Sequence, residues 1–243
     1  MTLNERKTGA LARKAVMHFW QVREAQASKQ RESGKTDQGF RAAVTGGAQM
    51  NGFIEALKEL ADIGRIPQEA IYTKSRFLEL PGFFRPTKEW DFLIVWDDVL
   101  LAAIEAKSQV GPSFGNNFNN RTEEAMGSAL DLWTAFREKA YKHSIRPWLG
   151  YLFLLEDCPQ SQKPVSVREP HFEVFPEFRG ASYAKRYEIF CEKLILERHY
   201  DATAFLTSKR EEGISGQYSQ PCADISFHRF SVSLVSHLKG YQP

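Results

Sequence analysis

Two carboxylates and a lysine stand at a spacing that could hold a divalent metal ion beside a phosphodiester. Asp91 opens one apolar run, and a second run that starts at Val99 ends in Glu105-Ala106-Lys107. Because side chains alternate between the faces of a strand, Glu105 and Lys107 share one face. Two carboxylates with the Ala106 backbone carbonyl suit Mg²⁺. Lys107 could hold the phosphate, or orient or deprotonate the attacking water, although a base would need a lowered lysine pKa.

The same residues also fit a solvated hairpin end with an incidental glutamate–lysine pair. An acidic residue some distance ahead of a Glu-x-Lys motif is common by chance. Charges at the end of a buried strand are costly, however, unless they are paired, hydrated or bound to a metal. The Pro86 and Lys88 that precede Asp91, and the glycine- and asparagine-rich loop expected at 111–121, favour a metal site.

The apolar runs at about 90–96 and 99–107 predict a β-hairpin around Asp97-Asp98. A simple two-residue turn would leave Asp91 facing away from Glu105, because a one-residue change of register moves a side chain to the other face. A shared metal therefore requires a three-residue connection or an equivalent bulge. The pairs expected in that register are Asp91 with Glu105, Val95 with Leu101 and Trp96 with Leu100.

Helical periodicity and turn residues predict the other elements. Helices are expected at about 5–30, 51–63 (with Asn51 as the cap), 121–141 (with Asn120 as the cap) and 181–197, and Ile225–Leu238 favours a helix over a strand. Strands are expected at Ala70–Thr73, Phe77–Leu80, Trp148–Leu155 and Ala202–Thr207. The apolar run Trp148–Leu155 is typical of a central strand parallel to the second hairpin strand. Ser33–Gly47 is expected to be a mobile surface loop, and 157–180 a long irregular segment.

Composition bounds the class of protein. The 243 residues are 42% hydrophobic and 13% aromatic, as in a folded globular protein, and the net charge of +2 does not by itself indicate nucleic-acid binding. Three scattered cysteines indicate reduced thiols. We expect a cytoplasmic protein with no membrane association, because no signal peptide or membrane-length apolar run is present. No glycine-rich phosphate loop or nucleophile elbow supports other enzyme classes.

Several motifs together resemble the XhoI family of type II restriction endonucleases. They are RPTKEWD at 85–91, EAKS at 105–108, GPSFGNNFNNR at 111–121 and HFEVFPEFRGASYAKRYE at 171–188, with shorter matches at 18–20, 156–158 and 193–196. The similarity covers most of the chain to about residue 197. The last 45 or so residues add little to it.

The resemblance implies an α/β chain with the restriction-endonuclease-like PD-(D/E)xK fold, in which helices flank a central mixed β-sheet. It implies one nuclease domain over 1–243, with a helical part at about 1–65 and a catalytic core at about 66–210. It also implies a Mg²⁺-dependent homodimer that cuts double-stranded DNA at the palindrome CTCGAG and leaves 5′ overhangs, with a cognate DNA methyltransferase in the host. The family's catalytic residues fall on Asp91, Glu105 and Lys107, although Trp90 replaces the nominal proline before the aspartate. Glu55 is a candidate additional metal ligand, with Glu59 as its rival.

Reading CTCGAG in the major groove requires contacts to guanine, which suits arginine or lysine, and to adenine, which suits asparagine or glutamine. A palindromic site also requires a two-fold dimer. The candidate DNA-binding residues are Arg85, Lys88, Asn116, Asn117, Asn119, Asn120, Arg121, Lys185 and Arg186. Each could instead be an ordinary surface residue, and Asn120 could serve only as a helix cap.

Two other functions fit the same residues. One is a DNA repair or junction-resolving nuclease with the same fold, which would not produce discrete fragments. The other is a DNA-binding protein without catalytic activity, which intact Asp91, Glu105 and Lys107 argue against.

Overall fold

The computed structural model describes residues 3–33 and 47–241, so most of the predicted surface loop Ser33–Gly47 lies outside the described residues. The helices are α1 (Glu5–Ser33), α3 (Asn51–Ile63), α4 (Phe114–Arg137), α5 (Pro159–Gln162), α6 (Tyr183–Leu196), α7 (Arg210–Gly213) and α8 (Phe227–Gly240), and the 3₁₀ turns are η1 (Ala48–Met50), η2 (Gln68–Ala70), η3 (Ser75–Phe77) and η4 (Pro176–Phe178). The strands are β1 (Ile71–Tyr72), β2 (Glu79–Pro81), β3 (Thr87–Glu89), β4 (Phe92–Trp96), β5 (Val99–Gln109), β6 (Trp148–Glu156) and β7 (Ala202–Ser208).

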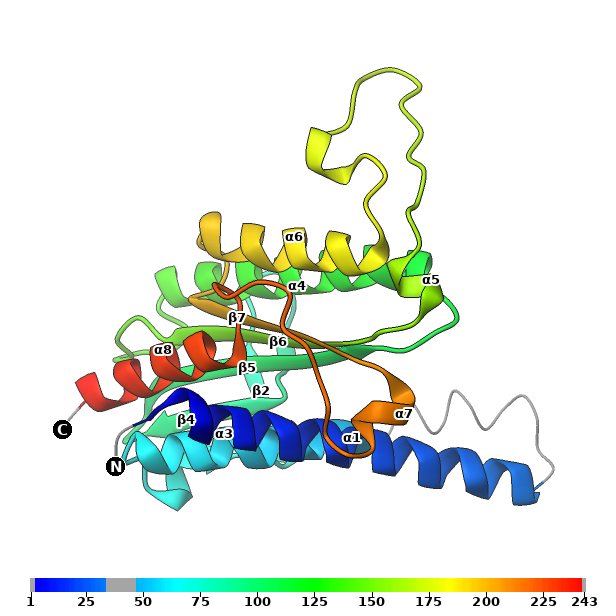
Figure 1. Cartoon of the computed structure of the whole chain (residues 1–243). Coiled ribbons are helices and arrows are strands. Elements are labelled where there is room, and N and C mark those ends of the chain that lie inside the picture. Colours follow the sequence, from blue (N-terminus) through cyan, green and yellow to red (C-terminus); the bar gives the residue numbers. More distant parts are fainter. Residues whose placement is uncertain (1–2, 34–46, 242–243) are drawn as a thin grey trace.

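Among the described residues, a five-stranded sheet has the order β1-β4-β5-β6-β7. β1, β4 and β5 are antiparallel neighbours, whereas β5, β6 and β7 are parallel. Helices cover both faces, with α4 and α6 on one side and α1, α3 and α8 on the other (Figure 1). The predicted central mixed sheet flanked by helices is therefore confirmed, as is the parallel pairing of Trp148–Leu155 with the second hairpin strand.

The alternation of side chains divides the core into two layers. Ile104 and Ala106 of β5 belong to the layer beneath α1, α3 and α8, whereas Ala103 belongs to the layer beneath α4 and α6. Glu105 and Lys107 therefore point toward the α4 side. Every residue of β6 and β7 is buried, which explains why both sequences are largely apolar, with Glu156, Thr203, Thr207 and Ser208 as the polar exceptions.

The hairpin β4–β5 combines a two-residue turn with a bulge. Trp96 pairs with Val99, and Asp97 and Asp98 occupy the turn with φ of 50° and 61°. The register then shifts by one residue between Val95 and Ile94. The pairs are Val95 with Leu100, Ile94 with Ala102, Leu93 with Ala103 and Phe92 with Ile104.

Leu101 is thus the extra residue of β5. The ladder ends at the pair Phe92–Ile104, next to Asp91 and Glu105, and this is the register that the prediction requires. The predicted bulge is confirmed. The predicted pairs Val95–Leu101 and Trp96–Leu100 are wrong, because the bulge lies two pairs beyond the turn rather than at it.

Helix α4 begins at Phe114, seven residues earlier than predicted, so the expected glycine- and asparagine-rich loop is helical. Glycine and asparagine are poor helix formers, but packing outweighs this cost. Phe114 stacks on Tyr183 and Phe118 meets the edge of Tyr187, both in α6. Asn120 is therefore an interior helix residue and not a cap. Ala125 and Ala129 lie on the buried face of the helix, whereas Met126 and Leu130 are exposed.

The strand predicted at Phe77–Leu80 is wrong in its first half, because Phe77 ends the turn η3 and β2 begins at Glu79. Most other predictions hold with small shifts. α3 ends before Gly64 as predicted, but Met50 occupies the cap position and Asn51 is the first helical residue. α8 confirms the favoured helix in the C-terminal segment. The segment between α5 and α6 is largely irregular and projects from the body (Figure 1). All three cysteines are free thiols. Within 3–33 and 47–241, no helix combines the length and apolarity needed to cross a membrane.

Candidate active site

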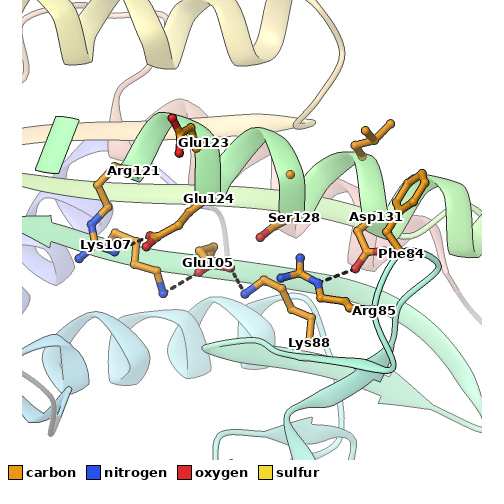
Figure 2. Close-up of a pocket in the computed structure, with 12 residues that line it drawn as sticks. Phe84, Arg85, Lys88, Glu105, Lys107, Arg121, Glu123, Glu124, Ser128 and Asp131 are labelled. Carbon is orange, nitrogen blue, oxygen red and sulfur yellow. Dashed lines mark hydrogen bonds and ion pairs between the residues drawn. The ribbon is translucent and has the colours of Figure 1, made fainter. Parts of the chain in front are cut away.

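Lys107 links the two predicted metal-binding carboxylates. Its Nζ lies 2.6 Å from Glu105 Oε1 and 3.0 Å from Asp91 Oδ2. Lys88 Nζ lies 2.7 Å from the other oxygen, Glu105 Oε2. Figure 2 shows both lysines pointing at Glu105 from opposite sides. We call these four residues the charged cluster. Its two anions and two cations compensate one another, which makes burial of the glutamate tolerable.

The hairpin bulge fixes Asp91 within the cluster. The Ala106 N–H donates to Asp91 Oδ2 at 2.9 Å, and the Asp91 N–H donates to the Ile104 carbonyl at 3.2 Å. In an extended strand the N–H and C=O of one residue point to the same edge. The Ala106 carbonyl therefore points to the edge that Asp91 occupies.

Burial and the lysines act in opposite directions on the carboxyl groups. Burial raises the pKa of Asp91 above its ordinary value, and this outweighs the attraction of Lys107. Burial also acts to raise the pKa of Glu105, but Lys107 and Lys88 together lower it. The Glu105 side chain is only 6% exposed, against 35% for Asp91, so Asp91 is the more accessible ligand.

Lys107 is protonated in this arrangement. Burial acts to lower its pKa, but the contacts with Glu105 and Asp91 reverse the effect, so that the pKa lies well above its ordinary value. The lowered lysine pKa that a base would require is therefore not found. A protonated Lys107 is suited to contact a phosphate oxygen.

Two hollows meet at the cluster. The first, the α4 pocket, has a volume of about 580 Å³ and lies between Glu105, Lys88 and the residues of α4 (Figure 2). The second, the groove, measures about 710 Å³ and runs from Asp91 and Ala106 along the end of β5 to the first turns of α4. Lys107 and Arg121 line both. The cluster therefore opens to two adjoining surfaces.

The predicted DNA-binding residues Arg85 and Lys88 lie beside the cluster, but both have protein partners. Arg85 Nε donates to Asp131 Oδ2 at 2.7 Å, and its side chain remains 42% exposed. Lys88 is ion-paired with Glu105 and lies over the ring of Trp90. Lys88 therefore stabilises the buried Glu105, whereas Arg85 remains available to solvent.

The four asparagines differ in position along α4. Asn117 lines the groove, whereas Asn116, Asn119 and Asn120 are exposed. Arg121 donates to Glu124 at 2.6 Å, and its Nε is buried without a hydrogen-bond partner among the described residues. An unpartnered buried donor is costly, so Arg121 is prepared to take an acceptor from a ligand. The structure thus brings Asn117 and Arg121 to the cluster.

Lys185, Arg186 and Glu55 have partners outside the cluster. Lys185 pairs with Glu188 at 2.6 Å. Arg186 donates to the carbonyls of Ala181 and Val165, and so ties the projecting segment to α6. Glu55 is exposed and pairs with Lys58 at 2.8 Å. Neither Glu55 nor Glu59 is among the described residues that line the α4 pocket or the groove.

Two residues beside the cluster were not predicted. Asp131 in α4 accepts the N–H groups of Phe83 and Phe84, each at 2.8 Å, as well as Arg85, and so holds the turn between β2 and β3. A Cβ at Gly82 would lie 2.5 Å from Asp131 Oδ2, so this turn needs a glycine. Arg23 of α1 lines the groove. Sequence spacing could not identify either residue, because their partners are distant in the chain.

No group of three histidine, cysteine or acidic side chains able to hold a metal occurs among the described residues. The donors present at the cluster are two carboxylates and the Ala106 carbonyl. Such oxygen ligands suit a hard cation that retains several waters. The residues therefore fit magnesium better than a thiolate- or imidazole-bound metal.

Several known proteins are similar to this chain. The family model described as restriction endonuclease XhoI matches residues 29–220. The type II restriction enzyme BstVI of Geobacillus stearothermophilus is 56% identical over 211 residues, which cover 85% of this chain and 93% of that enzyme. The type II restriction enzyme XhoI of Xanthomonas vasicola is 45% identical over 198 residues, which cover 81% of this chain and 79% of that enzyme. The type II restriction enzyme AbrI of Azospirillum brasilense is 51% identical over 161 residues, which cover 66% of this chain and 72% of that enzyme. No solved structure matches the chain.

Proposed function

Because the chain belongs to the XhoI family of restriction endonucleases, and is therefore a type II site-specific deoxyribonuclease, we propose that Asp91, Glu105 and Lys107 are its catalytic residues. The observation that carries this proposal is the contact of one lysine with both carboxylates at the mouth of two hollows. Such an arrangement fits the PD-(D/E)xK nuclease fold, with residues 1–243 as one nuclease domain.

Magnesium is the proposed cofactor. Asp91, Glu105 and the Ala106 carbonyl would hold it, because Lys107 Nζ lies within 3.0 Å of both carboxylates and the Ala106 backbone faces the edge where Asp91 lies. When bound, the ion supplies an activated water and stabilises charge on the phosphate and the leaving oxygen. Glu55 has no support as a further ligand, because its side chain is exposed and paired with Lys58.

The protein residues orient the reacting groups. Protonated Lys107 donates hydrogen bonds to a non-bridging oxygen of the scissile phosphate and so stabilises the negative charge that develops there. Lys88 keeps Glu105 ionised within the buried end of the strand. The Ala106 N–H keeps Asp91 turned toward Glu105.

Sequence recognition is proposed to lie on the first turns of α4. Asn117 and Arg121 line the groove beside Asp91 and offer the amide and guanidinium groups that suit adenine and guanine edges. The site is proposed to be CTCGAG, cut by a homodimer to leave 5′ overhangs, since a palindrome presents the same half-site to each protomer. A methyltransferase that protects this site is expected in the host, without a stable complex.

Digestion of plasmid and phage DNA with Mg²⁺, followed by sequencing of the fragment ends, tests this function. We expect discrete fragments that end in TCGA overhangs and no cleavage in EDTA. Random nicking, or dependence on branched DNA, would instead indicate a repair or junction nuclease. If the parent and Glu105→Ala bound DNA alike and neither cleaved it, the protein would be a binding protein without catalytic activity.

A further inference from the structure

The C-terminal helix contacts the bulge that sets the register of the active-site hairpin. Leu101 is the extra residue of β5, and its side chain is completely buried. A bulge disrupts the ladder of backbone hydrogen bonds, and a buried carbonyl without a partner is costly. His237 of α8 provides the partner: its Nε2 lies 3.0 Å from the Leu101 carbonyl oxygen.

The chemistry of this contact defines the state of the ring. A carbonyl oxygen only accepts, so Nε2 must carry the hydrogen. Burial lowers the pKa of His237 below its ordinary value, against the opposing effect of the hydrogen bond to Leu101. The ring is therefore neutral near pH 7 with the proton on Nε2.

We propose that His237 is a positioning residue for the active site: by satisfying the Leu101 carbonyl it stabilises the bulge that turns Asp91 toward Glu105. The link is geometrical. Without the one-residue shift at Leu101, Asp91 would pair with Ile104 and its carboxylate would leave the face that Glu105 occupies. α8 lies beyond residue 220, where the family match ends, so this contribution comes from a part of the chain that the family model does not cover. The catalytic consequence rests on the proposed function, but the structural consequence does not.

Two substitutions with side chains of similar length distinguish the effect of the His237 hydrogen bond from the effect of its packing. His237→Gln retains an N–H donor near the position of Nε2, whereas His237→Met fills similar space without one. His228→Met is the matched control, because His228 is also a half-buried histidine of α8 but contacts Thr8 of α1, at 3.1 Å. All measurements are made well below the lowest melting temperature of the set.

The first readout needs neither metal nor DNA. Hydrogen exchange of the Ala106 amide reports on Asp91, because that amide donates to Asp91 Oδ2 at 2.9 Å. We expect exchange at least about tenfold faster in His237→Met, and near the parent rate in His237→Gln and His228→Met. Equal exchange in all four proteins, or faster exchange in His228→Met as well, would overturn the proposal.

The second readout is DNA cleavage. We expect kcat to fall roughly 10- to 100-fold in His237→Met, since a small displacement of a catalytic group is costly. KM should stay within about threefold, because substrate contacts are unchanged. His237→Gln should recover most of the rate. If the parent cleaves no DNA but Ala106 exchange responds as expected, the proposed function fails and the positioning role of His237 stands.

Discussion

The hairpin β4–β5 carries a pair of carboxylates at each end, and the two pairs lie in different environments. Asp97 and Asp98 occupy the exposed turn with left-handed backbone conformations. Asp91 and Glu105 lie at the open end, where Lys107 contacts both and Lys88 contacts Glu105. Water solvates the first pair, whereas the second requires protein cations. Burial with fixed counter-charges, rather than the presence of two acids, distinguishes a candidate site from a turn.

The largest expected effect is a difference in cleavage rate between variants at the two ends of the hairpin. Glu105→Gln should lower kcat by about 10³-fold or more, because metal binding contributes several kcal/mol and each 1.36 kcal/mol is tenfold in rate. Asp98→Asn at the turn should leave the rate within about twofold, since an exposed turn residue seldom affects a distant site. Single-turnover cleavage of a plasmid measures both. Comparable losses in the two variants would remove the distinction between the ends.

A smaller effect is expected where the open end meets α4. Asn117→Ala should cost about 1–3 kcal/mol in discrimination between cognate and one-base-altered sites, the usual value of a bidentate base contact. Asn116→Ala is the control, because Asn116 is the exposed neighbour on the same helix. Competition cleavage of the two substrates measures the ratio. If Asn117→Ala discriminated between the two substrates as well as the parent does, Asn117 would not be a base-reading residue.

The structure around the open end should also respond to acid. Burial acts to raise the pKa of Asp131, but the N–H groups of Phe84 and Phe83 and the Arg85 side chain lower it below its ordinary value. A carboxyl group whose pKa is lowered by folding stabilises the folded state at pH values above its pKa in the unfolded chain, which is about 4. This contribution is lost as the pH falls through the folded pKa. Urea unfolding from pH 6 downward should show a steeper loss for the parent than for Asp131→Asn, and parallel curves would contradict the assignment.

The smallest effect is expected at the turn itself. Asp98 has φ of 61°, which glycine adopts without strain. Asp98→Gly should therefore keep the type of turn and stabilise the protein by up to about 1 kcal/mol, with cleavage unchanged. Thermal unfolding and plasmid cleavage test this. A loss of activity would mean that the turn, and not only the bulge, determines where Asp91 lies.

The sequence predicted those features that depend on local periodicity. Strand β6 and helix α6 were identified from their apolar patterns, because the pattern follows burial directly. The bulge was predicted from a chemical requirement, since Asp91 and Glu105 must share a face. Its position at Leu101 was not predictable, because the donor for its carbonyl comes from His237, 136 residues away.

The start of α4 shows the same limit. Local propensity predicted a loop at 111–121, but the contacts of Phe114 and Phe118 with α6 make most of it helical. For the site, the sequence named Asp91, Glu105 and Lys107 but assigned Lys88 to DNA. The structure instead places Lys88 against Glu105. Such pairings between segments depend on tertiary packing, which spacing alone does not encode.

The central claim is that Asp91 and Glu105 together bind a metal ion. The most direct test is the position of that ion in crystals of the unsubstituted enzyme with duplex DNA. Mn²⁺ can replace Mg²⁺ in such crystals, and its anomalous scattering locates it without assumption. We predict an anomalous peak within coordination distance, roughly 2.0–2.3 Å, of carboxylate oxygens from both Asp91 and Glu105. A peak bound by other residues, or one that contacts only one of these carboxylates, would contradict the account.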